Sequence, residues 1–272
     1  MPELPEVETT KRGILQNLHS KTVTQVVVRE SRLRWRVPEN LPETLIQKTL
    51  KHIHRRGKYL LFEFPHGYLI GHLGMSGSFR VLAADTPVRK HDHIDIIFQD
   101  GLCLRYHDPR RFGCLLWVDE DVEQHKLISV LGVEPLEDKL TGDYLYQKSR
   151  SKRLAVKNFI MDSHIVVGVG NIYANEALFL AQIHPATPAQ KVTLKQYHQL
   201  VEHIKQVLTI AIQQGGTTLR DFTNAEGQAG YFQQTLHVYG RDGERCHCGL
   251  AQIEKVVIGQ RATYFCPVCQ LI

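Results

Sequence analysis

The chain lacks any long hydrophobic run and any strong net charge, and both absences exclude classes of protein. No apolar stretch reaches the roughly 18 residues that a membrane-spanning helix needs, so we expect no membrane partner. With 43% hydrophobic and 22% charged residues, the composition excludes a disordered or low-complexity chain. The segment from Met1 to Glu6 is acidic and proline-rich, where a secretory signal is basic and apolar, and this predicts a cytoplasmic protein.

Charge of one sign is in small excess, with 33 lysines and arginines against 28 acids, and a net charge of +5 alone does not require a polyanionic partner. The distribution of the basic residues is more informative, because it is clustered. The clusters lie at Arg29–Arg36, Lys51–Lys58, Arg105–Arg111 and Lys148–Lys157. Aromatic side chains such as Trp35 and Tyr106 lie within them, as is typical of surfaces that contact phosphates and stacked bases. The pattern indicates nucleic-acid binding.

Cysteine is scarce, with six in the chain, but four of them lie near the C-terminus. A reducing compartment disfavours a disulfide framework, so the group indicates a metal. The pairs Cys246/Cys248 and Cys266/Cys269 bracket a predicted hairpin and predict one structural Zn²⁺ ion in a zinc ribbon. The first pair has a single intervening residue, where ribbons normally have two, so His247 is an alternative ligand. Cys103 and Cys114 lie in apolar runs and are interpreted as small buried residues.

The order of elements predicts an α+β fold: an N-terminal helix on a β-sandwich, a helical domain and a C-terminal zinc ribbon. Short runs rich in β-branched and aromatic residues are predicted as strands in the first part of the chain, forming a two-layer antiparallel sandwich or barrel. These runs are Thr22–Val28, Tyr59–Phe64, Tyr68–His72, His93–Phe98, Leu102–Tyr106 and Cys114–Val118. The expected domains are residues 1–133, 134–234 and 235–272.

Helical spacing from Tyr197 to Ile212 predicts a long helix that ends near Gly215-Gly216. Two shorter helices are expected on either side of the turn at 166–171, with Asn171 as the cap of the second. That turn is consistent with anion binding or with a plain helix-hairpin connection. Strands are predicted at Thr235–Tyr239, Gln252–Ile258 and Ala262–Phe265, with Gly259-Gln260 at the last hairpin tip and Arg261 beside it.

The N-terminus carries a candidate nucleophile. Removal of Met1 before a proline leaves Pro2 with a free secondary amine, whose pKa near 8 makes it far more often uncharged than a lysine at neutral pH. Such an amine attacks an aldehyde-level carbon to give an iminium ion. Glu3 and Glu6 lie close enough in sequence to act as acid or base. The alternative interpretation is that Pro2 and Pro5 only open a helix.

Seven motifs in order resemble one family, the bacterial formamidopyrimidine-DNA glycosylases, which excise oxidised purines. The resemblance covers essentially the whole chain and includes the zinc ribbon. Its segments are Met1–Thr9, Arg55–Leu60, His72–Gly77, Lys90–His93, Asp108–Gly113, Gly168–Tyr173 and Val238–Arg241.

The resemblance implies a bifunctional glycosylase and AP lyase (acting on apurinic or apyrimidinic sites) with a helix-two-turn-helix domain. By this resemblance, Pro2 attacks C1′ of the damaged nucleotide and forms a Schiff base, and Glu3 is the general acid in opening of the sugar ring. Lys58 donates a proton for β-elimination and holds a phosphate, and Arg261 binds phosphate and assists δ-elimination. The implied contacts to double-stranded DNA are His72, Met75, His91, Arg110, Phe112, Lys152, Lys157, Asn171 and Tyr239.

Within that set, Met75, Arg110 and Phe112 match an inserted trio that fills the space left when a base is flipped out of the duplex. Two alternative interpretations of the chain are an enzyme of the endonuclease VIII type, which prefers oxidised pyrimidines, and a non-catalytic DNA-binding zinc protein. Leu4 and the complete trio favour the purine enzyme. We expect the lesion-recognising loop within Thr217–Tyr231, a monomer, and association with the bacterial nucleoid through DNA.

Overall fold

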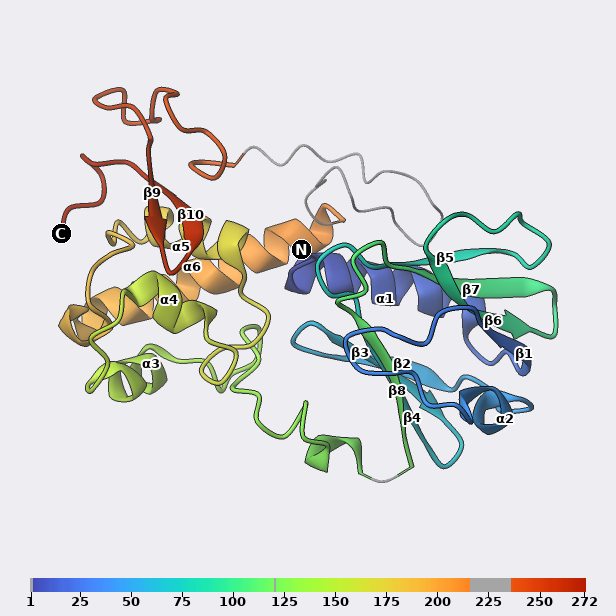
Figure 1. Cartoon of the computed structure of the whole chain (residues 1–272). Helices are drawn as coiled ribbons and strands as arrows, with labels where there is room; N and C mark the ends of the chain where they lie inside the picture. Colours follow the sequence, from blue (N-terminus) through green and yellow to red (C-terminus); the bar gives the residue numbers. More distant parts are fainter. Residues whose placement is uncertain (1, 120, 216–235) are drawn as a thin grey trace. The chain divides into compact units, whose positions relative to one another are not determined.

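The computed structural model describes residues 2–119, 121–215 and 236–272. The chain divides into two compact units, which are described separately below. The first contains residues up to Ser129, and the second contains Val130–Gln213 and the C-terminal segment (Figure 1). No helix in the described ranges is long and apolar enough to cross a membrane. The lesion loop expected at 217–231 lies outside the described residues.

The first unit begins with α1 (Leu4–Leu18), whose start follows from its first residues. Glu3 and Glu6 form a capping box, in which the backbone N–H of Glu3 donates to Oε2 of Glu6 at 2.8 Å. Pro5 lies in the first turn, where its missing N–H costs nothing. Val7, Ile14 and Leu18 repeat at helical spacing and pack into the core of the unit. The predicted N-terminal helix is therefore confirmed.

Eight strands form two four-stranded antiparallel sheets, which confirms the sandwich. One sheet has the order β1 (Val23–Val28), β6 (Asp92–Phe98), β7 (Leu102–His107) and β5 (Ser78–Ala83). The other has the order β2 (His52–Arg56), β3 (Tyr59–Phe64), β4 (Gly67–His72) and β8 (Cys114–Val118). The inner faces pack together, as shown by the rings of Phe62 and Phe79, whose centroids lie 5.5 Å apart in an edge-to-face arrangement.

Six of the eight strands match the predicted runs, whereas β2 and β5 were not predicted, nor was the short helix α2 (Leu41–Leu45). A 3₁₀ turn, η1 (Val122–Gln124), follows the sandwich. Cys103 and Cys114 are fully buried, as expected, and burial raises the pKa of each thiol to about 12.

One predicted basic cluster is only partly a surface feature. Arg105 is 1% exposed, and it donates from Nε and Nη2 to the two carboxylate oxygens of Asp95 at 2.8 and 2.9 Å. Arg80 is also buried and donates to Asp92. These pairs satisfy charges inside the β1–β6–β7–β5 sheet. The interpretation of Arg105 as part of a phosphate-binding surface is therefore wrong.

The second unit is helical, with a hairpin near its end. Its helices are α3 (Gly142–Ser149), α4 (Val156–Met161), α5 (Asn171–Leu180) and α6 (Leu194–Gln213), with the 3₁₀ turn η2 (Ala189–Lys191) before α6. In this unit α5 packs on α4, on α6 and on β10. The hairpin pairs β9 (Glu254–Ile258) with β10 (Arg261–Phe265). The strand expected at Thr235–Tyr239 is wrong, because residues 236–239 form no strand.

Candidate active site and DNA-contact residues

The residues at the start of the chain form a buried acidic site. Pro2 is buried, and Glu3 and Glu6 are 3% and 1% exposed. Both carboxylates lie at the first turn of α1, where the positive end of the helix dipole stabilises negative charge. The structure thus brings together three of the predicted catalytic residues. Met1 lies outside the described residues.

Lys58 lies in the two-residue turn of the β2–β3 hairpin. Arg56 pairs with Tyr59, so Gly57 and Lys58 form the turn, and Gly57 takes the left-handed φ of +55° that this connection requires. A side chain of β2 stabilises this turn, because Nη1 of Arg55 donates to the carbonyl of Gly57 at 3.0 Å. The hairpin therefore presents Lys58 at its tip.

Glu8 joins this hairpin to α1. Its Oε2 accepts from Nε of Arg55 at 3.0 Å, and its Oε1 lies 2.9 Å from Nζ of Lys11. Burial opposes ionisation of Glu8, but the hydrogen bond from Lys11 and the charges of Lys11 and Arg55 outweigh it and lower the pKa of the carboxyl. Glu8 thus ties the Lys58 hairpin to the helix that begins after Pro2. Glu8 could not be singled out from the sequence, because its partner Arg55 is 47 positions away.

His72, at the end of β4, is held as a neutral ring. Its Nδ1 accepts from the backbone N–H of Gly74 at 3.0 Å, and its ring lies 4.7 Å from that of Tyr59. Burial, with smaller contributions from the positive charges of Lys58 and Arg34, lowers the pKa of His72 to about 4. Because Nδ1 accepts, the proton of the neutral ring lies on Nε2, which makes that atom the available donor.

We expect this shift to make the protein less stable in mild acid. As the pH falls below about 6.5, the unfolded chain protonates His72 while the folded protein does not until about pH 4, so the free energy of unfolding decreases. The expected loss from this residue between pH 7 and pH 5 is about 1 to 2 kcal/mol. Urea unfolding of wild type and His72→Asn, whose amide oxygen can replace Nδ1 as acceptor, measures it. A wild-type pH dependence no steeper than that of the variant would contradict the assignment.

Asp108 organises the loops that carry Met75, His91, Arg110 and Phe112. It is fully buried, and its Oδ2 accepts from the hydroxyl of Tyr106 at 3.1 Å and from the N–H of Gly113 at 2.9 Å. Oδ1 accepts from Oγ of Ser76 at 3.1 Å. Its backbone N–H donates to the carbonyl of His91 at 3.1 Å, and its own carbonyl pairs with Nε2 of His93 at 2.8 Å. The carboxylate and the backbone of this one residue therefore hold three loops that lie far apart in the sequence.

Gly74 brings two of these loops into contact. It has a φ of +61°, and a Cβ atom placed on it would lie 2.5 Å from the backbone N of Gly113 and from the carbonyl carbon of Phe112. The loop of Met75 therefore packs against the loop of Arg110 and Phe112, backbone on backbone. Met75, Arg110 and Phe112, which the resemblance predicts to be inserted into the duplex, thus lie on two loops in backbone contact.

The same region holds an open basic hollow of about 560 Å³. It is lined by Arg32, Arg34, Arg110, Arg111 and Phe112. The guanidinium of Arg110 lies 4.8 Å from the ring centroid of Phe112, which is 44% exposed. This exposed aromatic beside an arginine suits contact with a base and with phosphates.

In the second unit, α5 holds the C-terminal hairpin through polar side chains. The prediction that Asn171 caps α5 is wrong, because Gly170 is the N-cap. Instead, Nδ2 of Asn171 donates to the carbonyl of Ala262 at 2.9 Å. One turn later, Oδ1 of Asn175 accepts from the N–H of Tyr264 at 2.8 Å. These two bonds fix β10 along the helix.

Lys157 supports the same strand from α4. It is fully buried, and its Nζ donates to Oγ1 of Thr263 at 2.6 Å and to the carbonyl of Ala262 at 3.2 Å. Its neighbour Asn158 lies against Gly259 at the hairpin tip. Gly259 and Gln260 both have left-handed φ values, as a tight two-residue turn requires. Arg261 lies beside this tip, as predicted, and its side chain is exposed. Lys152, by contrast, lies exposed in the segment before α4.

Tyr239 lies in a segment that Glu176 of α5 holds in place. The buried Glu176 carboxylate accepts from the backbone N–H groups of His237, Val238 and Tyr239 at 2.7 to 2.9 Å. The Tyr239 ring packs edge-on against Tyr264, with centroids 5.0 Å apart. Glu176 could not be singled out from the sequence, because a single acid in an otherwise apolar helix gives no signal of its backbone partners.

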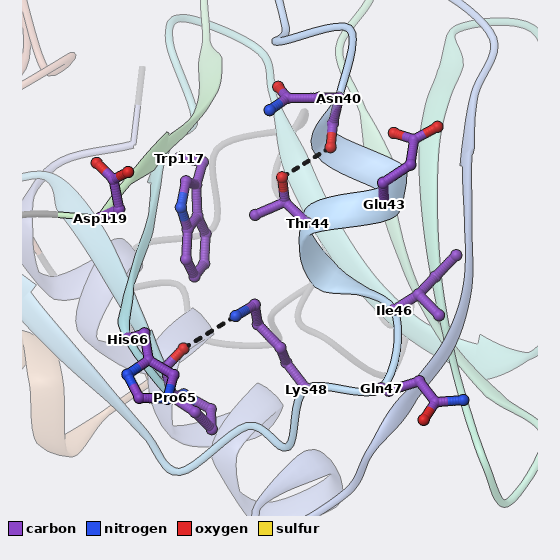
Figure 2. Close-up of a pocket in the computed structure, with 10 residues that line it drawn as sticks. All are labelled: Asn40, Glu43, Thr44, Ile46, Gln47, Lys48, Pro65, His66, Trp117 and Asp119. Atoms are coloured by element: carbon purple, nitrogen blue, oxygen red, sulfur yellow. Dashed lines mark hydrogen bonds between the residues drawn. The ribbon is translucent and has the colours of Figure 1, made fainter.

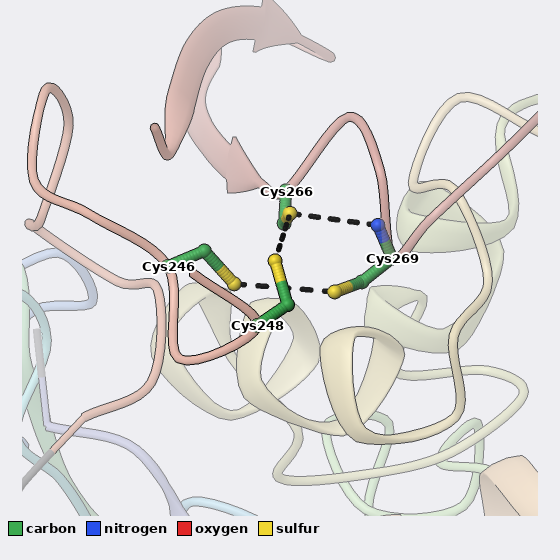
Figure 3. Close-up of side chains that lie close together, drawn as sticks. All are labelled: Cys246, Cys248, Cys266 and Cys269. Carbon is green, nitrogen blue, oxygen red and sulfur yellow. Dashed lines mark hydrogen bonds between the residues drawn. The ribbon is translucent and has the colours of Figure 1, made fainter. Parts of the chain in front are cut away.

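The four C-terminal cysteines converge on one point (Figure 3), and their sulfur atoms all lie within 4.8 Å of one another. The pairs Cys246/Cys269 and Cys248/Cys266 are 3.9 and 3.8 Å apart. Four thiolates around one zinc ion at about 2.3 Å would be about 3.8 Å apart, so the donor set fits. His247 is not in this group. Its Nε2 lies 3.2 Å from Nη1 of Arg241, and its ring packs edge-on against the ring of His237. The four cysteines thus form a site that could hold a metal ion.

A second hollow, of about 670 Å³, lies beside α2 (Figure 2). Lys48 projects into it, donates to the carbonyl of Pro65 at 3.2 Å, and lies 5.3 Å from the ring centroid of Trp117. Residues predicted for catalysis, DNA contact or metal binding do not line it.

Comparison with known proteins agrees with this architecture. The profile of the formamidopyrimidine-DNA glycosylase N-terminal domain matches residues 1–115, and that of the H2TH (helix-two-turn-helix) domain of the same family matches residues 131–223. A formamidopyrimidine-DNA glycosylase of Methylococcus capsulatus is 56% identical over 270 residues, covering 99% of this chain and 100% of the relative. That of Saccharophagus degradans is 54% identical with the same coverage.

Solved structures agree as well. The Lactococcus lactis Fpg protein, solved with DNA containing an abasic site, superposes with a TM-score of 0.91 at 35% identity, covering 99% of this chain and 100% of that one. The MutM (Fpg) protein of Thermus thermophilus gives a TM-score of 0.88 at 34% identity, with coverages of 99% and 98%. The fold and these matches define a DNA glycosylase. The chain belongs to the formamidopyrimidine-DNA glycosylase family, which confirms the resemblance, the α+β fold and the enzyme class predicted from the sequence.

Proposed function

We propose that the chain excises oxidised purines such as 8-oxoguanine and formamidopyrimidines from double-stranded DNA and cleaves the resulting abasic site by β,δ-elimination. The observation that carries this proposal is the buried site of Pro2, Glu3 and Glu6, tied to the Lys58 hairpin through Glu8. Glycosylase and AP lyase activities are general to the family to which the chain belongs.

In the proposed reaction the nitrogen of Pro2 bonds to C1′ as the bond from C1′ to the base breaks, and the base leaves with the electron pair. Glu3 protonates the ring oxygen of the sugar, which opens the ring and leaves an iminium ion on Pro2. Glu6, hydrogen-bonded to the backbone of Glu3, holds that residue and supplies the second carboxylate. Lys58 holds a phosphate and serves β-elimination, and Arg261 holds a phosphate for δ-elimination.

The remaining predicted contacts have distinct proposed roles. Met75, Arg110 and Phe112 fill the space left by the flipped nucleotide, with Arg110 pairing the orphaned cytosine. Backbone contacts are assigned to His72, His91, Lys152, Asn171 and Tyr239. For Lys157, whose side chain is buried, we propose that it serves DNA binding by holding β10 and so orienting the Arg261 tip. In this proposal residues 1–133 form the catalytic domain, residues 134–234 the DNA-binding helical domain and residues 235–272 the zinc ribbon. The protein acts as a monomer on nucleoid DNA in the cytoplasm.

Borohydride trapping tests the proposal. A duplex carrying one 8-oxoguanine opposite cytosine should become covalently linked to the chain when borohydride reduces the iminium ion, and peptide mass spectrometry should place the linkage on Pro2. Product analysis should show a one-nucleotide gap flanked by phosphates. Binding without trapping would favour a non-catalytic DNA-binding protein, and preferential trapping on oxidised pyrimidines would favour the endonuclease VIII type.

For the metal we propose one structural Zn²⁺ ion held by Cys246, Cys248, Cys266 and Cys269, where it would stabilise a hairpin too small to fold alone. We expect about one zinc per purified chain by elemental mass spectrometry. Removal by a strong chelator should abolish DNA binding, and added zinc should restore it. Cys266→Ser should lower the zinc content, whereas Cys103→Ser, at a buried cysteine outside the cluster, should not. Unchanged DNA affinity of the metal-free chain would contradict the structural role.

A further inference from the structure

Two of the arginines that line the basic hollow beside Phe112 bind a carboxylate of the chain itself. Glu30 lies in the connection after β1, and its side chain is 19% exposed. Its Oε1 accepts from the backbone N–H and from Nε of Arg32 at 2.9 and 2.8 Å. Its Oε2 accepts from Nη2 of Arg32 at 2.7 Å and from Nη1 of Arg111 at 3.3 Å. A single carboxylate is therefore chelated by two arginines from separate segments.

The four arginines around the hollow differ in what they contact. Arg32 and Arg111 are paired with Glu30, whereas Arg34 and Arg110 form no ion pair with the described residues and lie beside the rings of Trp35 and Phe112. The hydrogen bonds from Arg32 lower the pKa of Glu30 to about 2, so the carboxylate is ionised at every working pH. The hollow thus holds two arginines without a carboxylate partner and two that already bind an anion.

A carboxylate bound by guanidinium groups offers two acceptor oxygens and one negative charge, as a phosphodiester group would in the same place. The two arginines are exposed, Arg32 at 75% and Arg111 at 45%, so an approaching anion can reach their guanidinium groups. The main effect of the Glu30 carboxylate is on charge: it repels an approaching phosphate and occupies the donors that would bind it.

We propose that Arg32 and Arg111 form a binding site for a backbone phosphate of DNA, and that Glu30 occupies this site in the free protein as an internal competitor. A duplex binds there only by displacing the carboxylate, which keeps affinity for all duplexes, including the product, lower than the arginines alone would give. The proposal rests on the proposed function, since it requires that the chain bind DNA.

Glu30→Gln tests it, because glutamine keeps the shape of the side chain and removes its charge. We expect the variant to bind undamaged duplex about threefold to tenfold more tightly at 50 mM salt, with a plot of log K against log salt steeper by about 1 to 2. Release of the cleaved product should slow, so multiple-turnover rates should fall while single-turnover excision stays unchanged. A merely structural role for Glu30 would instead weaken binding.

Glu39→Gln is the matched control. Glu39 pairs with Arg36 at 3.0 Å on the same unit, and removing its charge changes the net charge by the same amount without touching the hollow. In an Arg111→Ala background, the steepening caused by Glu30→Gln should fall by about half. Equal salt slopes for Glu30→Gln and Glu39→Gln, or a full gain that survives replacement of both Arg32 and Arg111, would overturn the proposal. Absence of any binding or trapping by wild type would instead reject the proposed function.

Discussion

Replacing Pro2 with glycine is expected to reduce lesion excision by on the order of 10²-fold or more and to weaken or abolish borohydride trapping. The variant loses the secondary amine that forms the iminium ion, and the primary amine left in its place attacks less effectively. Gel-resolved trapping and single-turnover excision on a duplex with one 8-oxoguanine opposite cytosine measure both effects.

Pro5→Ala is the control, because Pro5 also lies buried at the start of α1 but has no free amine. If Pro2 only opened the helix, the two variants would lose activity together. We expect Pro5→Ala to trap normally. Efficient trapping by a form of the chain whose Pro2 nitrogen is acetylated would reject the covalent mechanism.

Gly74→Ala is expected to have the second large effect. The added methyl group would lie 2.5 Å from backbone atoms of Phe112 and Gly113, which cannot yield without moving the loop of Arg110. We expect a loss of about 3 kcal/mol or more in the free energy of unfolding, together with loss of excision opposite cytosine. Urea unfolding and single-turnover excision measure the two effects.

Gly101→Ala provides the comparison for this variant. Gly101 also has a left-handed φ, +80°, but nothing lies within 4 Å of an added Cβ. Its substitution should cost only the backbone strain, about 1 kcal/mol, and leave excision intact. Equal losses for the two variants would show that the contact between the loops is unimportant.

Most of the predicted strands are rich in apolar side chains, whereas the missed strand β2 is mostly polar. The strand β2 consists of His52, Ile53, His54, Arg55 and Arg56, of which only Ile53 is fully buried, and it is a strand because it pairs with β3 across a two-residue turn. In β5, Arg80 is buried against Asp92, which no local pattern could indicate.

The opposite error occurred at residues 235–239, whose alternating pattern predicts a strand. The N–H groups of His237, Val238 and Tyr239 all donate to the carboxylate of Glu176, so they are not available for a sheet. The candidate site shows the same limit. The proposed catalytic residues Pro2, Lys58 and Arg261 were predicted from sequence motifs. The supporting residues Glu8, Asp108 and Glu176 gave no such signal, because they contact groups distant in sequence.

The attachment of the hairpin to α5 has a consequence for which changes in chain length the protein can tolerate. Asn171, Asn175 and Glu176 reach their partners only because they lie on one side of a continuous helix. One residue inserted after Asn171 would rotate the rest of α5 by about 100° and carry both later anchors away from their partners. In natural variants, insertions and deletions should therefore accumulate in surface connections such as Asp100-Gly101 and be absent from this helix.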